Sequence, residues 1–148
     1  DRVTLLPHQD SPFTVREIAS FHDDRGGTLR GGNTIRVFTA DGISVAHLGD
    51  LGHPLSAEQL AAIGPVDAAL VPVGGVYTLD AAGAKSVCDA LKPRCVLPMH
   101  YRHAPYGLAE VGGVEPFLAL WPQAEVHRLS GPAIELTKAV SGVLVPQF

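Results

Sequence analysis

The chain has 148 residues, of which 46% are hydrophobic and 18% charged, and its formal net charge is −4 at pH 7. This composition is too apolar for a disordered segment and predicts one globular domain over residues 1–148. The negative charge and the scattered Lys and Arg residues argue against nucleic acid as a partner. Because the apolar runs are too short to cross a membrane and no segment resembles a signal peptide, we expect a cytoplasmic protein without membrane attachment.

A strand followed by a glycine-rich loop is predicted near the N-terminus. Residues 13–21 alternate apolar and polar side chains for most of their length, which is typical of a half-buried strand ending at His22. Residues 23–33 then contain four glycines, whose tolerance of positive φ suits a tight loop. Arg25 and Arg30 lie on this loop, which we expect to border a pocket.

The next segment predicts a β-hairpin. Residues 34–39 and 43–48 are both rich in strand-forming side chains, and Ala40-Asp41-Gly42 separates them. An Asp-Gly pair between two such runs is a strong hairpin signal. Asp50 therefore lies just beyond the end of the second strand.

A short helix and a buried strand should follow the hairpin. Ser56 with Gln59 has the form of a capping box, and Gly64-Pro65 closes the helix that the box opens. Residues 67–73 form an almost continuous apolar run, which indicates a strand covered on both faces.

A second helix and strand complete a crossover unit. Thr78 is the predicted cap of a helix that ends at Lys92-Pro93, since apolar residues recur there every three or four positions. The short strand 95–97 then leads to His100. The strand, helix, strand order predicts a parallel pair of strands.

The C-terminal region has weaker signals. A bent or late-starting helix is expected within residues 107–121, with the better pattern over 114–121. Residues 125–129, 133–137 and 143–145 are predicted as closing strands.

Three residues of metal-ligand type each follow a predicted strand. His22, Asp50 and His100 come from separate strands, whose ends can meet at one edge of a sheet. Singly, each is more often a turn residue or a solvated histidine. Together they predict a metal site at this edge.

Four local sequences resemble one family. They are His47-Leu48-Gly49-Asp50-Leu51-Gly52-His53, the segment 71–78, Pro98-Met99-His100-Tyr101, and Phe21-His22-Asp23 with the Gly-Gly and Gly-Gly-Asn that follow it. Together they resemble the metallo-β-lactamase superfamily, in the branch similar to L-ascorbate-6-phosphate lactonase. The resemblance implies an α/β fold, as part of an αββα sandwich with mixed sheets and flanking helices.

The resemblance also implies a binuclear metal centre. In the family a His-x-His-x-Asp-His loop, a later His, a bridging Asp and a final His bind two ions; His22, Asp50 and His100 match the last three. The His-x-His-x-Asp-His loop does not occur in this sequence, and the first residue is not methionine. We therefore expect an incomplete domain that alone holds metal weakly and is inactive. Its partner would be a missing N-terminal segment or a second copy of the chain.

The implied chemistry is hydrolysis of a small molecule by hydroxide formed on Zn²⁺ or Mn²⁺, with a lactone, ester or phosphoester as substrate. Asp50 and His53 are the candidate catalytic residues. The candidate substrate-binding residues are Arg25, Arg30, Tyr101 and His103, and the arginines would suit an anionic substrate.

Two alternatives remain open. The chain could be a truncated or degenerate relative that is non-catalytic and acts through protein association, as the absent ligand loop suggests. The glycine-rich loop could instead bind phosphate, although its spacing fits neither common phosphate-loop pattern and a strand, not a helix, follows it. His53 could equally be an ordinary loop histidine.

Overall fold

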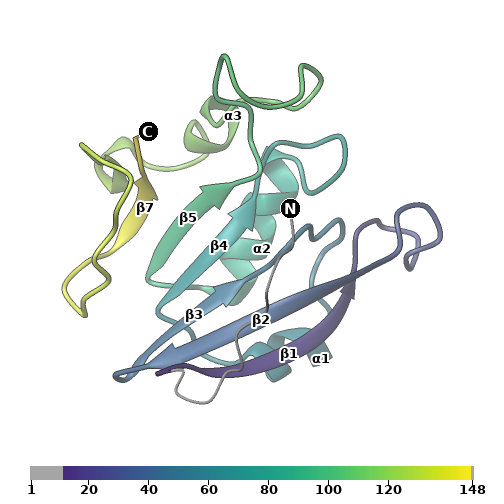
Figure 1. Ribbon diagram of the computed structural model, residues 1–148, viewed down its shortest axis with the longest axis horizontal. Coiled ribbons are helices and arrows are strands. Elements are labelled where there is room, and N and C mark those ends of the chain that lie inside the picture. Colours follow the sequence, from purple (N-terminus) through teal and green to yellow (C-terminus); the bar gives the residue numbers. More distant parts are fainter. Residues whose placement is uncertain (1–11, 148) are drawn as a thin grey trace, which may run out of the picture.

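The computed structural model describes residues 12–147, which form one seven-stranded mixed sheet with flanking helices (Figure 1). The strands are β1 (Thr14–Phe21), β2 (Gly32–Ala40), β3 (Ile43–His47), β4 (Ala68–Pro72), β5 (Cys95–Met99), β6 (Val126–Arg128) and β7 (Gly142–Val145). The helices are α1 (Ala57–Ile63), α2 (Ala81–Leu91) and α3 (Glu115–Leu118), with a 3-10 turn η1 (Gln123–Glu125). The predicted mixed α/β fold class is confirmed.

The strand order β1-β2-β3-β4-β5-β7-β6 sets the direction of every strand. β1 is antiparallel to β2 and β2 to β3, so β1 and β3 run in the same direction. β3, β4 and β5 are parallel neighbours, and α2 connects β4 to β5 as the predicted crossover. β1, β3 and β5 therefore all end at the same edge of the sheet.

The core lies between the sheet and the helices. Val37, Ala46, Ala69, Val96 and Val143 are neighbours in register across five strands, and each is almost completely buried. They belong to one cluster with apolar side chains of α2 and α3. Figure 1 shows α1 and α2 on the same side of the sheet. The two central alanines of this row leave room for α2 to lie close to the sheet.

The opposite face is partly covered by the segment 129–141. Its apolar side chains, Leu129, Ile134, Leu136 and Val140, pack against a buried cluster of Ala68, Cys95 and Leu144. The prediction of a strand over 133–137 is wrong, because these residues form no ladder. Two carbonyls of the segment, those of Thr137 and Val140, instead accept hydrogen bonds from the guanidinium of Arg94. Its alternating apolar pattern thus reflects packing across the strands.

Two helix predictions also need correction. The cap of α2 is Asp80, whose side chain accepts a hydrogen bond from the Gly83 amide at 2.8 Å, and not Thr78. The helix starts later because the amide of the buried Leu79 already donates to the Leu51 carbonyl at 3.0 Å. α3 has only four residues, fewer than the predicted span. The capping box at Ser56 and Gln59 is confirmed.

Within residues 12–147, no helix combines the length and apolar character that crossing a bilayer demands.

Asp67, just before β4, joins three segments of the chain. Its carboxylate accepts hydrogen bonds from the Ser44 amide at 2.9 Å, from Arg94 at 3.1 Å and from Lys138 at 2.8 Å. The Lys138 bond, together with the Ser44 amide and Arg94, outweighs burial and lowers the pKa of Asp67 to about 2. The carboxylate thus holds the segment 129–141 against the sheet as an ion.

We predict that Asp67→Asn lowers the free energy of unfolding at pH 7 by about 1–2 kcal/mol, a value that allows for the solvent exposure of Lys138. The folded-state pKa lies below the unfolded value of about 3.9. The stabilisation is therefore full above that value and is lost as the pH falls through about 2. Urea unfolding of both proteins at several pH values measures this.

The matched control is Asp89→Asn, which removes an exposed carboxylate paired with Lys85 within α2. It should cost less than about 0.5 kcal/mol. An equal loss for both variants would contradict the role given to Asp67.

Candidate metal centre

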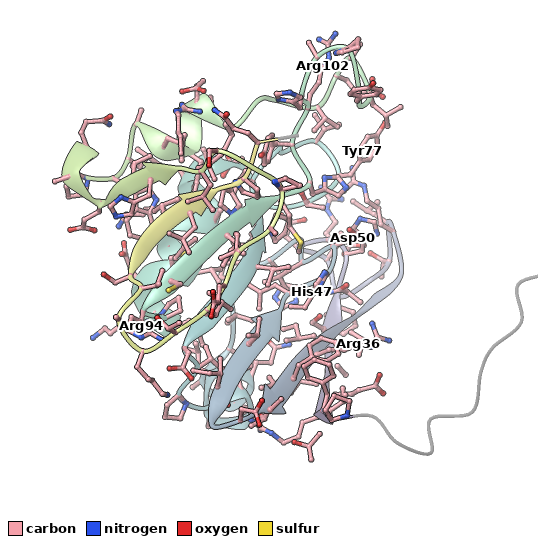
Figure 2. The ribbon with its side chains drawn as sticks, turned by 60° about the vertical axis from the view of Figure 1, so that its left-hand side comes forward. Arg36, His47, Asp50, Tyr77, Arg94 and Arg102 are labelled. Atoms are coloured by element: carbon pink, nitrogen blue, oxygen red, sulfur yellow. The ribbon has the colours of Figure 1, made fainter. Side chains whose placement is uncertain are left out.

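His22, Asp50 and His100 converge at the edge where β1, β3 and β5 end. The Nε2 atom of His22 lies 4.0 Å from Oδ2 of Asp50, and Nε2 of His100 lies 3.8 Å from Oδ1. Figure 2 labels Asp50 at this edge, above His47 of β3. The predicted convergence is confirmed, and the two imidazoles approach different oxygens of one carboxylate.

The environment of these side chains is that of a partly open site. Nε2 of His22 is buried and has no hydrogen-bond partner. The Asp50 side chain is 53% exposed, so the carboxylate faces the solvent between the two imidazoles. Buried polar atoms without partners are uncommon in proteins. The orphaned nitrogen therefore points to a ligand.

The separations fit metal coordination in pairs. Zinc binds imidazole nitrogen and carboxylate oxygen each at about 2.1 Å, so an ion shared by both atoms needs them within about 4.2 Å of each other. Both pairs meet this limit. Within residues 12–147, no three His, Cys, Asp or Glu side chains are close enough together to hold a single ion. The described residues thus fit one ligand pair for each of two ions, with Asp50 common to both.

Two glycines allow the loops to approach the histidines closely. A Cβ atom on Gly52 would lie 2.5 Å from the carbonyl oxygen of His22, and one on Gly74 would collide with the carbonyl oxygen of His100. Gly52 also donates its amide to the Phe21 carbonyl at 3.1 Å. These positions therefore require glycine, since any side chain would push the backbone of His22 or His100 away.

Asp23 organises the glycine-rich loop from inside. It is almost fully buried, and its carboxylate accepts the backbone amides of Arg25, Gly27, Leu29 and Arg30 at 2.7–3.0 Å. Burial raises the pKa of Asp23, but the four amide donors outweigh it and bring the pKa to about 2. Since these amides already bind Asp23, they are not free to bind phosphate. The engagement of these amides argues against the phosphate-loop alternative.

Sequence reasoning gave Asp23 no role of its own. The available signal was an aspartate immediately before a loop with several glycines, because such a loop turns many backbone amides inward and needs an acceptor for them.

The two predicted arginines, Arg25 and Arg30, lie on the glycine-rich loop that follows His22. Both are exposed, and the guanidinium of Arg30 lies over the Tyr77 ring at 5.7 Å from its centroid. The Tyr77 hydroxyl donates to Glu110 at 2.8 Å, and this hydrogen bond raises the pKa of Tyr77. Arg30, Tyr77 and Glu110 thus link the three loops that carry them. Figure 2 shows Tyr77 between Asp50 and Arg102. Substrate binding by Arg25 and Arg30 stays a prediction.

His53 contacts the backbone through both ring nitrogens. Its Nε2 accepts the Phe21 amide at 3.1 Å, and Nδ1 lies 2.7 Å from the Pro54 carbonyl oxygen. The acceptor role of Nε2 places the proton on Nδ1. In this arrangement the imidazole ties the end of β1 to the loop before α1. A role in proton transfer would require it to leave these partners, and it stays a prediction.

The two candidates after His100 differ in environment. Tyr101 is partly buried against the core, and this burial raises the pKa of its hydroxyl. His103 is exposed in the loop after β5, where its backbone forms an isolated antiparallel β-bridge with Tyr106. Substrate contact stays a prediction for both.

Comparisons with known proteins place the chain in a family. Residues 8–100 match the family described as beta-lactamase superfamily domain. The chain belongs to the metallo-β-lactamase superfamily. The matched residues include all three side chains that converge at the sheet edge.

Relatives within the superfamily include proteins named UPF0173 metal-dependent hydrolases. The one from Carboxydothermus hydrogenoformans is 38% identical over 104 residues, covering 68% of this chain and 46% of the relative. The one from Thermococcus onnurineus is 35% identical over 101 residues, covering 67% and 45%. The chain thus spans less than half the length of these curated relatives.

Two solved structures agree with the fold. A Thermotoga maritima protein, described as a candidate Zn-dependent hydrolase of the metallo-β-lactamase superfamily, has a TM-score of 0.76 and 36% identity. The match covers 89% of this chain and 63% of that protein. A Parabacteroides distasonis protein, with a TM-score of 0.60 and 13% identity over 90% of this chain and 50% of its own, shares the fold.

We predict that Asp23→Asn loosens the loop beside the candidate metal centre. An asparagine retains one acceptor oxygen but turns its own donors toward backbone amides, which leaves some of these buried groups unpaired. The melting temperature should fall by several degrees, and hydrogen exchange should accelerate at Leu29 and Arg30. The neighbouring exposed Asp24 offers the control: Asp24→Asn should shift the melting temperature by no more than about 1 °C.

Proposed function

We propose that this chain supplies part of the binuclear metal centre of a hydrolase that acts on a lactone, ester or phosphoester. The observation that carries the proposal is the arrangement of His22 and His100 on different oxygens of Asp50. A carboxylate shared in this way suits two ions about 3.5–4 Å apart, as in two-metal hydrolases. The names of the relatives, metal-dependent hydrolases, support the same reaction class.

The ions proposed are zinc or manganese, which accept nitrogen and oxygen donors. His22 with Asp50 would hold one ion and His100 with Asp50 the other. When bound, such ions lower the pKa of a water molecule and polarise the substrate oxygen. The remaining ligands would come from outside the described residues, either from further chain or from a second copy.

The chain's own residues would bind and orient the substrate. Arg25 and Arg30 place two positive charges on the loop beside the histidines, which favours a substrate with an anionic group. Within the superfamily, we propose that the chain belongs to the branch similar to L-ascorbate-6-phosphate lactonase. Within the proposal, Asp50 would contribute one oxygen to each ion.

The central test is Asp50→Asn in the full-length protein. Loss of one carboxylate oxygen and of the charge should remove most of the bound metal in elemental analysis. Hydrolysis of a lactone, a phosphodiester or a thioester, whichever the wild type accepts, should fall by at least about 100-fold.

The control for this test is Asp41→Asn, an exposed position in the turn between β2 and β3. It should leave both metal content and rate unchanged. A wild-type protein that binds no metal and hydrolyses none of these substrates would instead favour the non-catalytic alternative.

Arg30→Gln tests the anionic substrate. If a charged group of the substrate binds this guanidinium, KM for an anionic substrate should rise by about tenfold while a neutral analogue is unaffected. Arg36→Gln, which removes an exposed arginine paired with Glu17 in the sheet, should change neither. An equal effect of Arg30→Gln on charged and neutral substrates would contradict a direct contact.

A further inference from the structure

The side chain of Asn33, the second residue of β2, bridges two ligand-bearing segments. Its amide nitrogen donates to Ser20 Oγ at 2.8 Å and to the Leu48 carbonyl at 2.9 Å. Its carbonyl oxygen accepts the backbone amide of Asp50 at 3.0 Å. One planar carboxamide group thus makes all three hydrogen bonds.

These bonds fix the turn that presents Asp50. Asn33 holds the carbonyl of Leu48 and the amide of Asp50, the residues on either side of Gly49. Gly49 has a φ of 62°, and a Cβ atom there would collide with the Asn33 side-chain oxygen. The amide of Leu48 is already tied to the Leu70 carbonyl at 3.1 Å. The backbone at Asp50 is thereby held from both sides.

The same carboxamide also reaches the segment of His22. Ser20 is buried and lies two residues before His22 on β1. The His22 amide donates to the Gly31 carbonyl at 3.1 Å, just before β2 begins. The end of β1 is therefore anchored to the start of β2, where Asn33 lies.

We propose that Asn33 is a positioning residue of the metal centre, which sets the backbone of Asp50 relative to His22 through these three hydrogen bonds. This inference rests on the proposed function. Asn33 acts through Asp50 and His22. Residues that orient metal ligands typically contribute a factor of about 10–100 to metal affinity or activity.

Asparagine suits this position for a chemical reason. The site needs two donors and one acceptor in a short, rigid group, and the asparagine amide supplies them. Aspartate would direct an oxygen at the Leu48 carbonyl, and serine is too short to reach both Leu48 and Asp50. The Asn33 side chain therefore has a specific hydrogen-bonding role in addition to its place in β2.

The test uses Asn33→Ala in the full-length protein, with Zn²⁺ affinity measured by competition with a chelator and amide exchange measured at Asp50. Loss of the three bonds should weaken Zn²⁺ binding by at least about tenfold. The Asp50 amide should exchange faster in the metal-free protein, because its acceptor has gone.

The matched control is Ser44→Ala. It removes a 3.0 Å side-chain hydrogen bond between Ser44 and Thr39, which joins β2 to β3 at the end of the hairpin away from the metal centre. It should lower the melting temperature yet leave Zn²⁺ affinity and Asp50 exchange unchanged. Should Asn33→Ala fail to fold, Asn33→Ser replaces it with the same expected loss of affinity.

The outcomes separate the two proposals. If Asn33→Ala or Asn33→Ser binds Zn²⁺ within about twofold of the wild type, with only the loss of stability seen for Ser44→Ala, the positioning role is overturned. A wild-type protein that binds no Zn²⁺ overturns the metal centre itself, whatever the variants do. A tenfold loss confined to the Asn33 variants supports both.

Discussion

The site depends on one constraint, the common direction of β1, β3 and β5. The chain reverses twice between β1 and β3, once in the glycine-rich loop and once in the hairpin turn, and the α2 crossover brings β5 alongside β4 in the same direction. The segments that follow these strands must then begin at one edge. The histidines and Asp50 meet because of this topology, although 78 positions separate His22 from His100.

Strand direction alone does not fix where the loop residues lie. Hydrogen bonds between side chains and the backbone of the loops set their positions. The side chains of the buried Asp23 and the half-buried Asn33 bind amides and carbonyls in the loops that carry the candidate ligands. Glycines at the closest approaches leave space for those contacts. At the edge where β1, β3 and β5 end, the loops are thus held by polar side chains that bind the backbone. The apolar core fixes the sheet itself.

Sequence patterns predicted the parts of this arrangement that depend on local chemistry. The Asp-Gly hairpin, the capping box at Ser56 and the strand preceding Asp50 follow from turn chemistry and apolar periodicity. The contacts of Asn33 could not be predicted in this way, since they join residues whose proximity is known only once β1 to β3 are paired. Those of Asp23 are local, and the glycines that follow it were their signal. The segment 133–137 misled because alternating apolar residues can pack across strands without pairing to them.

The attachment of the segment 129–141 has a consequence for ionic strength. Arg94 binds two carbonyls of that segment and the carboxylate of Asp67, so its hold depends on directed hydrogen bonds from a planar group. Dissolved salt weakens attraction between exposed charges, such as Lys138 and Asp67, far more than it weakens hydrogen bonds to neutral carbonyls. At high salt the segment would therefore keep its polar attachment to the sheet through the arginine, whereas a lysine at this position would lack the planar group that makes these bonds together.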